Sequence, residues 1–386
     1  MESSASRDSY AHNSALQNRN FHAIAKPRLH KAIAHLMHSR SMAGHEGPKQ
    51  LAVADLGCSY GRNTIDCALF ILQTLRHHFI NSTPSAKHNI VDAEADHAEA
   101  AGAGEEEEEE EQGMEVHYFF SDLPSNDFNA LFRALDALQR RDEQQGLDNM
   151  KMYAAGVPGS FHSRLFPSAS LDFVVCCYSL HWLSQVPPSI LDRSSPSWNG
   201  GSTWIYKSAK EVLNAYSLQA KVDIRSFIRN RAHEMRSGGV LFLFVAGSSQ
   251  VPNYCPQAHR KTLWEIFDTA WFELVEEGTI TLEEMEMFNM PMFFLSKDEL
   301  KSALMEAPEF QLLQLESIEN IYKQDNLSLQ EWGSFLTSVT KPIVSSYLGP
   351  YKTIKLYERM KALTLHQHSI FMQLMHCLLV ASLQRL

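Results

Sequence analysis

The feature that most constrains this chain is a short buried strand that ends in a glycine turn and leads into a helix. Residues 51–57 (LAVADLG) are apolar apart from Asp55, and helical spacing follows from about Asn63 to Phe79. An apolar run of this length is typical of a strand covered on both faces, as in a parallel sheet. A glycine turn after such a strand lets the backbone approach a ligand. The turn does not match GxGxxG, which disfavours a nicotinamide dinucleotide.

Strand and helix patterns then alternate along the chain. The expected strands are 116–124, 152–157, 171–177 and 240–246, and the expected helices are 128–140 and 214–236, the last ending at Gly238-Gly239. Glycines after a periodic segment indicate the end of a helix. Strands that alternate with helices predict an α/β fold with a mainly parallel sheet.

From His259 onward helical patterns dominate. Ser296 to Glu299 reads as a capping box that opens a helix. The expected helices are 259–278, 297–306, 330–347 and 352–383, with a strand candidate at 310–316. We therefore expect an α/β core and an α-helical cap. The core is assigned to 51–184 and 205–250, and the cap with the C-terminal elements to 185–204 and 251–386.

The net charge of −11 over 386 residues comes from one segment. Residues 92–112 contain eleven acidic residues and no Lys or Arg, and without them the acidic and basic residues are equal at 34 each. The balanced remainder gives no support for nucleic-acid binding. So acidic a segment buries too little apolar surface to order itself, which predicts a disordered insertion. A functional acidic arm is the alternative interpretation.

Neither a membrane span nor a secretory signal is expected. No apolar run approaches the about 20 residues that a spanning helix needs, and the N-terminal residues MESSASRDSYAHN have no apolar core. A cytoplasmic protein is the simplest interpretation. The six cysteines include no CxxC pair, which argues against a disulfide framework or a zinc site.

Polar residues at the ends of two strands are candidates for ligand binding. In VADLGCSYGRN (53–63), Asp55 is suited to accept hydrogen bonds from a bound amino group, or else is a structural residue of the turn. In SDLPSNDFN (121–129), Asp122 is placed where an acidic residue commonly holds ribose hydroxyls. Its alternative role is a helix cap, which suits Asn126 or Asp127 better.

Two later segments add aromatic candidates. In GVPGSFHSRLFP (156–167), Ser160 is suited to bind an adenine edge and Phe161 to cover its face, although a tight loop with a buried Phe is the simpler alternative. In YSLHWLSQVP (178–187), Tyr178, His181 and Trp182 combine aromatic surface with polar tips. His181 on its own is also compatible with a satisfied core residue.

In this order the segments resemble the SABATH family of plant S-adenosylmethionine-dependent methyltransferases. SYAHNSALQ (9–17) and FNMPMFF (288–294) extend the resemblance over most of the chain. It implies a Rossmann-like class I methyltransferase core, with residues 1–50 as an N-terminal substrate lid. The implied cofactor-binding residues are Tyr10, Asp55, Cys58, Asn63, Asp122, Leu123, Ser160, Phe161 and Cys177, and the implied substrate-binding residues are Gln17, Tyr178, His181 and Trp182.

The resemblance also implies a Mg²⁺ site in some members. The corresponding positions here are Asn199, Glu286, Phe288 and Asn289. Glu286 stands where Asp is usual, and WNGG stands where the family has Asn-Lys-Gly, so the match is poor. The glycine-rich start that the family has before SYA is also missing, which predicts a shorter lid.

The resemblance implies esterification of a small, largely apolar acid. A carboxylic acid with a pKa near 4 is ionised at neutral pH, so the reaction needs no general base and no residue is assigned as one. We expect the Gln17 amide and the Trp182 indole N–H to orient the carboxylate. The alternatives are N-methylation of a xanthine-like heterocycle and a catalytically silent ligand-binding homologue. Family members are often homodimers, and the sequence does not indicate which acid is methylated.

Overall fold

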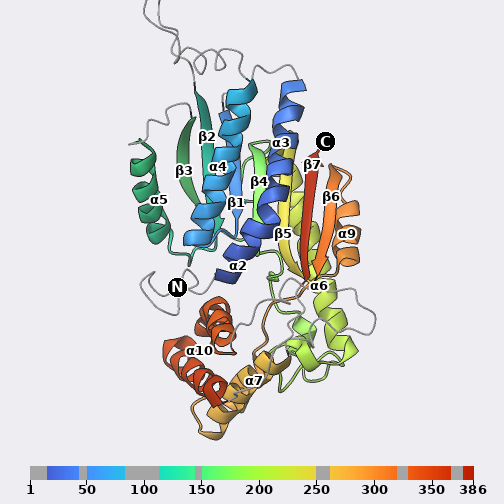
Figure 1. The fold of residues 1–386 in the computed structure, drawn as a ribbon. Coiled ribbons are helices and arrows are strands. Elements are labelled where there is room, and N and C mark those ends of the chain that lie inside the picture. The colour runs from blue at the N-terminus through green and yellow to red at the C-terminus, as the bar shows by residue number, and fades with distance from the viewer. Residues whose placement is uncertain are drawn as a thin grey trace, which may run out of the picture.

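One seven-stranded sheet organises the chain, with helices packed against it and a helical region beyond the ends of its strands (Figure 1). The computed structural model describes residues 15–42, 50–82, 113–143, 150–248, 261–319, 329–366 and 377–386. The acidic insertion expected at 92–112 and the candidate residue Tyr10 lie outside these residues.

The sheet has the strand order β3-β2-β1-β4-β5-β7-β6. Its strands are β1 (Gln50–Leu56), β2 (Met114–Asp122), β3 (Met150–Pro158), β4 (Leu171–Cys177), β5 (Met235–Gly247), β6 (Phe310–Glu319) and β7 (Cys377–Arg385). β1 to β5 are parallel, and β7 runs antiparallel between β5 and β6. The predicted α/β fold with a mainly parallel sheet is confirmed.

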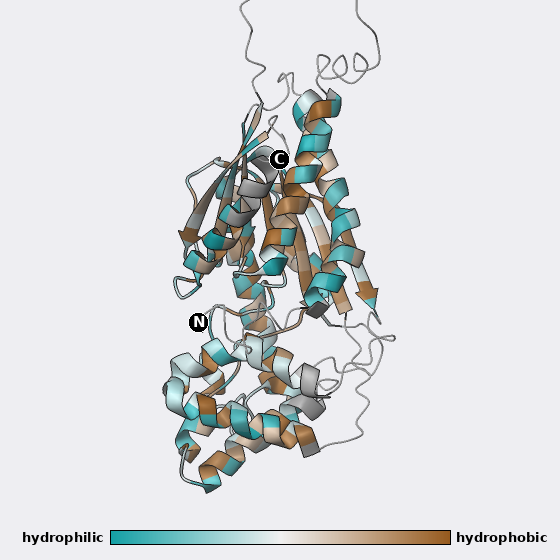
Figure 2. Ribbon diagram, turned by 60° about the vertical axis from the view of Figure 1, so that its left-hand side comes forward, coloured by the Kyte–Doolittle hydropathy of each residue, from teal (hydrophilic) through white to brown (hydrophobic). Residues whose placement is uncertain are grey.

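Helices alternate with the parallel strands as expected. The helical segments outside the cap, apart from α9, are α2 (Ala15–Asn20), η1 (Phe21–Ala25), α3 (Lys26–Met42), α4 (Arg62–Ser82), α5 (Phe128–Glu143) and α6 (Lys210–Glu234). The central strands β1 and β4 are buried along nearly their whole length. Figure 2 shows brown, apolar strands inside the sheet, as expected where helices exclude water from both faces of a parallel sheet.

The cap lies beyond the carboxyl ends of the parallel strands (Figure 1). It is formed by η4 (Pro188–Ile190), η5 (Ile205–Lys207), α7 (Lys261–Glu276), α8 (Leu282–Met287) and α10 (Leu329–His366), and α10 is interrupted at Gly349. α7 packs on α10 and on α8. α9 (Lys297–Met305) instead packs on α6 and β6, and it begins with the predicted capping box of Ser296 and Glu299.

The C-terminal segment corrects the expectation of a helix over 352–383. Residues 377–385 form β7, which pairs with β5 and β6 and is buried from Cys377 to Leu383. A short run that is buried on both sides carries no periodicity that separates strand from helix. The chain beyond 251 is therefore not only a cap, because β6 and β7 extend the sheet.

The glycine pair at 238–239 belongs to a strand and does not end a helix. α6 ends at Glu234, and β5 begins at Met235 and runs through both glycines. A Cβ on Gly239 would lie 2.9 Å from the carbonyl oxygens of Arg236 and Asp172. The glycine is therefore required by close backbone contact where the pairing of β4 with β5 shifts register.

The N-terminal region is only in part separate from the core. α3 packs on α4, β4 and β5, so residues 26–42 belong to the helical layer on the sheet. Figure 1 shows α3 beside α4 in front of the strands. Residues 26–42 are thus part of the core and not of the expected lid of residues 1–50, and a lid role for the residues before α3 stays a prediction. Within the described residues no helix is long and apolar enough to cross a membrane.

Candidate active site

The four candidate segments meet at the carboxyl ends of neighbouring parallel strands. The Gly57 N–H after β1 donates to the Ser121 carbonyl of β2 over 2.8 Å, and the Gly159 N–H after β3 donates to the Asp122 carbonyl, also over 2.8 Å. The Tyr178 N–H after β4 donates to the Phe244 carbonyl of β5 over 2.7 Å. Main-chain hydrogen bonds thus fix these turns at one edge of the sheet, where ligands bind in open α/β folds.

The turn after β1 is closed by direct contact with the segment after β4. Gly57 has a φ of +72°, and a Cβ at this position would lie 2.3 Å from the Ser179 Oγ. The Ser179 hydroxyl donates to the Gly57 carbonyl, with oxygen atoms 2.9 Å apart. Ser59 also has a positive φ, of 61°. Backbone conformations of this kind are costly and cluster at functional sites. Ser179 was not among the predicted residues, because its partner is distant in the sequence.

Asp122 is held by the same turn. Its Oδ2 accepts the Ser59 N–H over 2.6 Å, and its Oδ1 accepts the Leu123 N–H over 2.7 Å. Burial raises the pKa of the carboxyl, and these two hydrogen bonds oppose the rise. Each carboxylate oxygen keeps a lone pair after accepting one N–H. Asp122 can therefore accept two further hydrogen bonds, which is the number that a ribose diol donates.

Asp55 lies deeper, at the end of β1. It is 3% exposed, and burial together with the charge of Asp122 raises the pKa of its carboxyl to about 8. A buried acid of this kind is uncharged near neutral pH in the free protein, and a nearby cation would stabilise its charged form. The position therefore suits a ligand that carries a positive charge.

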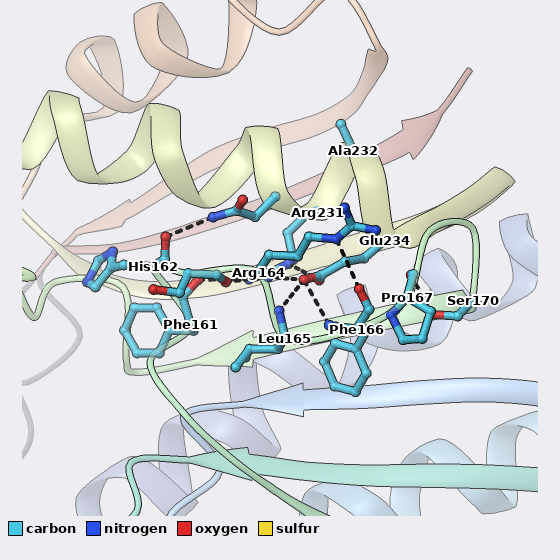
Figure 3. A network of polar contacts seen from close by, with 12 residues as sticks. Phe161, His162, Arg164, Leu165, Phe166, Pro167, Ser170, Arg231, Ala232 and Glu234 are labelled. Carbon is cyan, nitrogen blue, oxygen red and sulfur yellow. Dashed lines mark hydrogen bonds and ion pairs between the residues drawn. The ribbon is translucent and has the colours of Figure 1, made fainter.

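The loop after β3 carries Ser160 and Phe161 and is pinned to α6 (Figure 3). The Phe161 carbonyl accepts a hydrogen bond from Arg231 Nη1 over 2.8 Å. Its ring packs edge-on against Phe227, with ring centroids 6.1 Å apart. Ser160 Oγ accepts the His162 N–H over 3.3 Å.

The other implied cofactor residues lie around the same turns. Cys58 is buried, and burial raises the pKa of its thiol well above the usual value, so it is a neutral wall residue. Cys177 ends β4 and lies against the Cys67 thiol of α4. Asn63 is half-buried in the first turn of α4, and Leu123 is 52% exposed. The structure thus gathers the described cofactor candidates at one edge of the sheet.

The implied substrate residues Tyr178, His181 and Trp182 form an aromatic surface beside this edge. Tyr178 has a φ of 55°, and its ring packs on Phe244 with centroids 4.8 Å apart. The His181 ring is buried and stacks on Phe294 with ring centroids 5.4 Å apart. Phe294 lies in the segment 288–296 between α8 and α9, which is called the cap segment here. Trp182 pairs with Met292 in an isolated bridge. The loop after β4 is therefore joined to the cap by both rings and backbone.

Gln17 of α2 is 7% exposed, and the oxygen of its amide is buried. That oxygen has no hydrogen-bond partner among the described residues. A buried polar group without a partner costs about 1–3 kcal/mol, so such a group is suited to a ligand. The oxygen and nitrogen of an amide exchange places by rotation, so the buried end can present either an acceptor or N–H donors.

At the positions implied for Mg²⁺, the side chains contact other residues of the chain. The Glu286 carboxylate pairs with Arg193 Nη2 over 2.7 Å. Asn199 Nδ2 donates to the Asn289 Oδ1 over 2.8 Å, and Phe288 stacks on Trp271. Mg²⁺ binds oxygen ligands in octahedral geometry, and here Glu286 Oε2 and Asn289 Oδ1 accept hydrogen bonds from Arg193 and Asn199 instead. No group of three or more His, Cys, Asp or Glu side chains suited to a metal is present in the described ranges.

The comparisons with known proteins identify a family. Residues 1–95 and 96–386 match a family described as SAM dependent carboxyl methyltransferase. The chain is 34% identical to gibberellic acid methyltransferase 1 of Arabidopsis thaliana, over 87% of this chain and 84% of the relative. It is 31% identical to indole-3-acetate O-methyltransferase 1 of the same plant, over 99% of this chain and 94% of the relative.

A solved structure of loganic acid methyltransferase with S-adenosylhomocysteine has a similar fold. The TM-score is 0.79 at 26% identity, and the match covers 100% of this chain and 98% of that one. The similarity therefore includes the cap as well as the sheet.

Proposed function

Because the chain belongs to the family of S-adenosylmethionine-dependent carboxyl methyltransferases, we propose that it forms methyl esters of small, largely apolar acids. The observation that carries the proposal is the match of that family to the whole chain, with the cofactor candidates gathered at the carboxyl ends of β1 to β4. Relatives named for gibberellic and indole-3-acetic acids favour acids with a large apolar part.

In the proposed cofactor site, Asp122 binds the two ribose hydroxyls. Asp55 faces the positively charged methionine part, whose charge would draw the proton off this buried acid. Ser160 binds the adenine edge, and Phe161 covers the face of the ring. Cys58, Asn63, Leu123 and Cys177 line the remainder. This assignment uses the chemistry of each group: a carboxylate for a diol, an acid for a cation, and an aromatic ring for a base.

In the proposed acid site, the Gln17 amide and the Trp182 indole N–H each donate a hydrogen bond to the carboxylate. The buried Gln17 Oε1 has no partner among the described residues, and rotation of the amide would place its Nε2 there, where it can donate to the acid. Tyr178 and His181 shape the apolar part of the site. Neutral donors orient an anion without the strong stabilisation that an Arg pair gives, so the carboxylate stays reactive.

The reaction is a single displacement. S-Adenosylmethionine supplies an electrophilic methyl group, which passes to a carboxylate oxygen as the carbon–sulfur bond breaks and S-adenosylhomocysteine leaves. No proton moves, because the acid is already ionised near pH 7. The residues of the chain therefore act by alignment and by exclusion of water, and such alignment contributes up to about 10 kcal/mol to lowering a barrier.

N-methylation of a xanthine-like heterocycle is the second candidate function. It would use the same cofactor site and place a ring nitrogen where the carboxylate is proposed. His181 or Tyr178 would then assist removal of a proton. A catalytically silent ligand carrier is the third candidate, and it would bind acids without transferring a methyl group.

A panel of acids with isotopically labelled S-adenosylmethionine tests the proposal. Gibberellic, indole-3-acetic, jasmonic, salicylic, benzoic and cinnamic acids sample different sizes, and a dimethylxanthine samples the alternative. We expect one or more of the acids to give a labelled product. Mild alkali should hydrolyse this product, as it hydrolyses an ester. A labelled product that resists alkali would favour N-methylation. Binding without any labelled product would favour a silent carrier.

The homodimer and the cytoplasmic location expected from the sequence stay predictions. Light scattering on the purified chain tests the first, and imaging of a fluorescent fusion tests the second.

A further inference from the structure

The loop that carries Phe161 is held by an ion pair that is entirely buried. Arg231 and Glu234 of α6 are both 0% exposed, and Arg231 Nε donates to Glu234 Oε2 over 2.7 Å. Arg231 also donates to the carbonyls of Phe161, over 2.8 Å, and Ser163, over 3.1 Å. A buried pair is costly unless its hydrogen-bonding capacity is used, and here the main chain of the loop uses it (Figure 3).

Glu234 holds the other end of the loop. Its Oε1 accepts the Leu165 N–H over 2.6 Å and the Phe166 N–H over 3.1 Å. Arg231 thus donates to carbonyl groups of the loop, and Glu234 accepts hydrogen bonds from N–H groups of the same loop. These hydrogen bonds hold the loop against α6.

The same helix holds the loop after β4. Asp223 Oδ2 accepts the Ser184 N–H over 2.8 Å, and its Oδ1 accepts the Ser184 hydroxyl over 2.6 Å. Ser184 lies two residues after Trp182. The proposed adenine loop and the proposed acid loop therefore have one common support.

His162 joins the two loops directly. Its carbonyl accepts hydrogen bonds from Asn230 Nδ2 over 2.8 Å and from Ser226 Oγ over 3.0 Å, both on α6. Its ring lies against Phe161, with ring centroids 4.5 Å apart, and its Nε2 is 3.0 Å from the Trp182 carbonyl oxygen. A carbonyl only accepts, so Nε2 carries the proton in this contact.

We propose that His162 is a positioning residue that sets the distance between the acid and the methyl donor, by tying Trp182 to the loop of Phe161. This inference rests on the proposed function, in which Phe161 contacts the cofactor and Trp182 contacts the acid. A misplacement of about 1 Å between reacting groups can lower a rate about a hundredfold. Loss of the link should therefore slow methyl transfer more than it weakens either ligand.

The test compares three substitutions that differ in reach and polarity. In His162→Gln the amide Nε2 keeps a donor near the position of the imidazole Nε2. In His162→Asn the side chain is too short to bring its donor to that position, and in His162→Leu there is no donor. His117→Gln, on an exposed histidine of β2, is the matched control. For each variant we would measure kcat, KM for the acid, the dissociation constant of S-adenosylhomocysteine, and the melting temperature.

We expect kcat to fall about tenfold or more in His162→Leu and His162→Asn, and to stay within about threefold of wild type in His162→Gln. KM and the cofactor dissociation constant should change less than about threefold. Equal losses in Gln, Asn and Leu variants, or a kcat that does not change, would overturn the inference. If His162→Leu does not fold, the Gln and Asn variants decide. Absence of ester formation by the wild-type chain would instead overturn the proposed function.

Discussion

The proposed cofactor side and the proposed acid side of the site are held in place by different parts of the fold. On the cofactor side, Gly57 and Asp122 lie where parallel strands end, and main-chain hydrogen bonds between neighbouring strands fix them. On the acid side, Gln17 comes from an N-terminal helix and Trp182 from a loop that is bridged to Met292 of the cap segment. The first side is held by the sheet and the second by packing between segments that are distant in the sequence.

This difference in support predicts different effects of substitutions on the two sides. Changing a residue at a strand end disturbs the sheet edge and the cofactor together. Changing a side chain on the proposed acid side is expected to alter only what packs against the acid. Relatives named for gibberellic and indole-3-acetic acids are 34% and 31% identical to this chain. We therefore expect substitutions on the cofactor side to affect every substrate, and substitutions on the acid side to affect the acid alone.

The largest effect is expected from Asp122→Ala. Loss of two hydrogen bonds to a charged acceptor, at about 1.5–3 kcal/mol each, should weaken S-adenosylhomocysteine binding about a hundredfold or more. The loss should be the same with every acid. Calorimetric titration measures it, with Asp192→Ala in an exposed loop as the control. Binding within threefold of wild type would place the ribose elsewhere.

Gln17→Ala should act on the acid side alone. Loss of one hydrogen bond to a carboxylate should raise KM for the acid about tenfold, while the dissociation constant of S-adenosylhomocysteine stays near wild type. Steady-state kinetics at saturating cofactor measure the first quantity. Gln185→Ala, on an exposed glutamine of the loop after β4, is the control. An unchanged KM would show that the carboxylate is held by other groups.

Asp55 gives a pH dependence to the cofactor side. Its pKa is raised from 3.8 to about 8 in the folded protein, so the folded chain holds a proton that the unfolded chain has lost across this interval. Stability from this group is therefore full below pH 3.8 and falls as the pH rises toward 8. Asp55→Asn removes the dependence. The melting temperature of the variant minus that of the wild type should therefore be higher at pH 8.5 than at pH 6, by on the order of 3 °C.

The same variant should bind S-adenosylhomocysteine more weakly, because a neutral amide does not attract the cationic amino group. A melting-temperature difference that is constant with pH would contradict the raised pKa of Asp55. Equal cofactor binding by the variant would contradict its proposed role.

The smallest effect is expected from removal of divalent cations. Glu286 is paired with Arg193, and Asn199 with Asn289, so the implied Mg²⁺ positions have partners within the protein. Initial rates with excess EDTA should therefore stay within about twofold of rates with added Mg²⁺, since no reaction step depends on these positions. A rate that collapses with EDTA and returns with Mg²⁺ would mean that these side chains rearrange around the ion.

Much of the sheet could be predicted from local sequence. β4 was expected over its full length, and β1 within one residue, because continuous apolar runs beside turn residues identify buried central strands. β7 was missed because a continuous apolar run has no period that separates a strand from a helix, and here it was read as the end of the preceding helix. The Gly238-Gly239 pair was misassigned because the register shift beside β4 that requires it involves distant residues.

The positions of candidate residues at strand ends could be predicted from the sequence, whereas residues that act through distant partners were missed. Asp55 and Asp122 follow apolar runs directly, so their positions follow from the parallel sheet. Ser179 and the Arg231–Glu234 pair have no local signal of their role, because each acts by contacting a segment that the fold brings close. An Arg and a Glu three residues apart in a helix usually indicate an exposed ion pair, whereas here both are fully buried.

A crystal structure of the chain with S-adenosylhomocysteine and its preferred acid tests the account most directly. The account predicts both ribose hydroxyls within hydrogen-bond distance of the Asp122 carboxylate. It also predicts an acid carboxylate that accepts hydrogen bonds from Gln17 and from the Trp182 indole N–H, with one oxygen in line with the sulfur. A ribose bound away from Asp122, or a carboxylate held by groups other than Gln17 and Trp182, would contradict it.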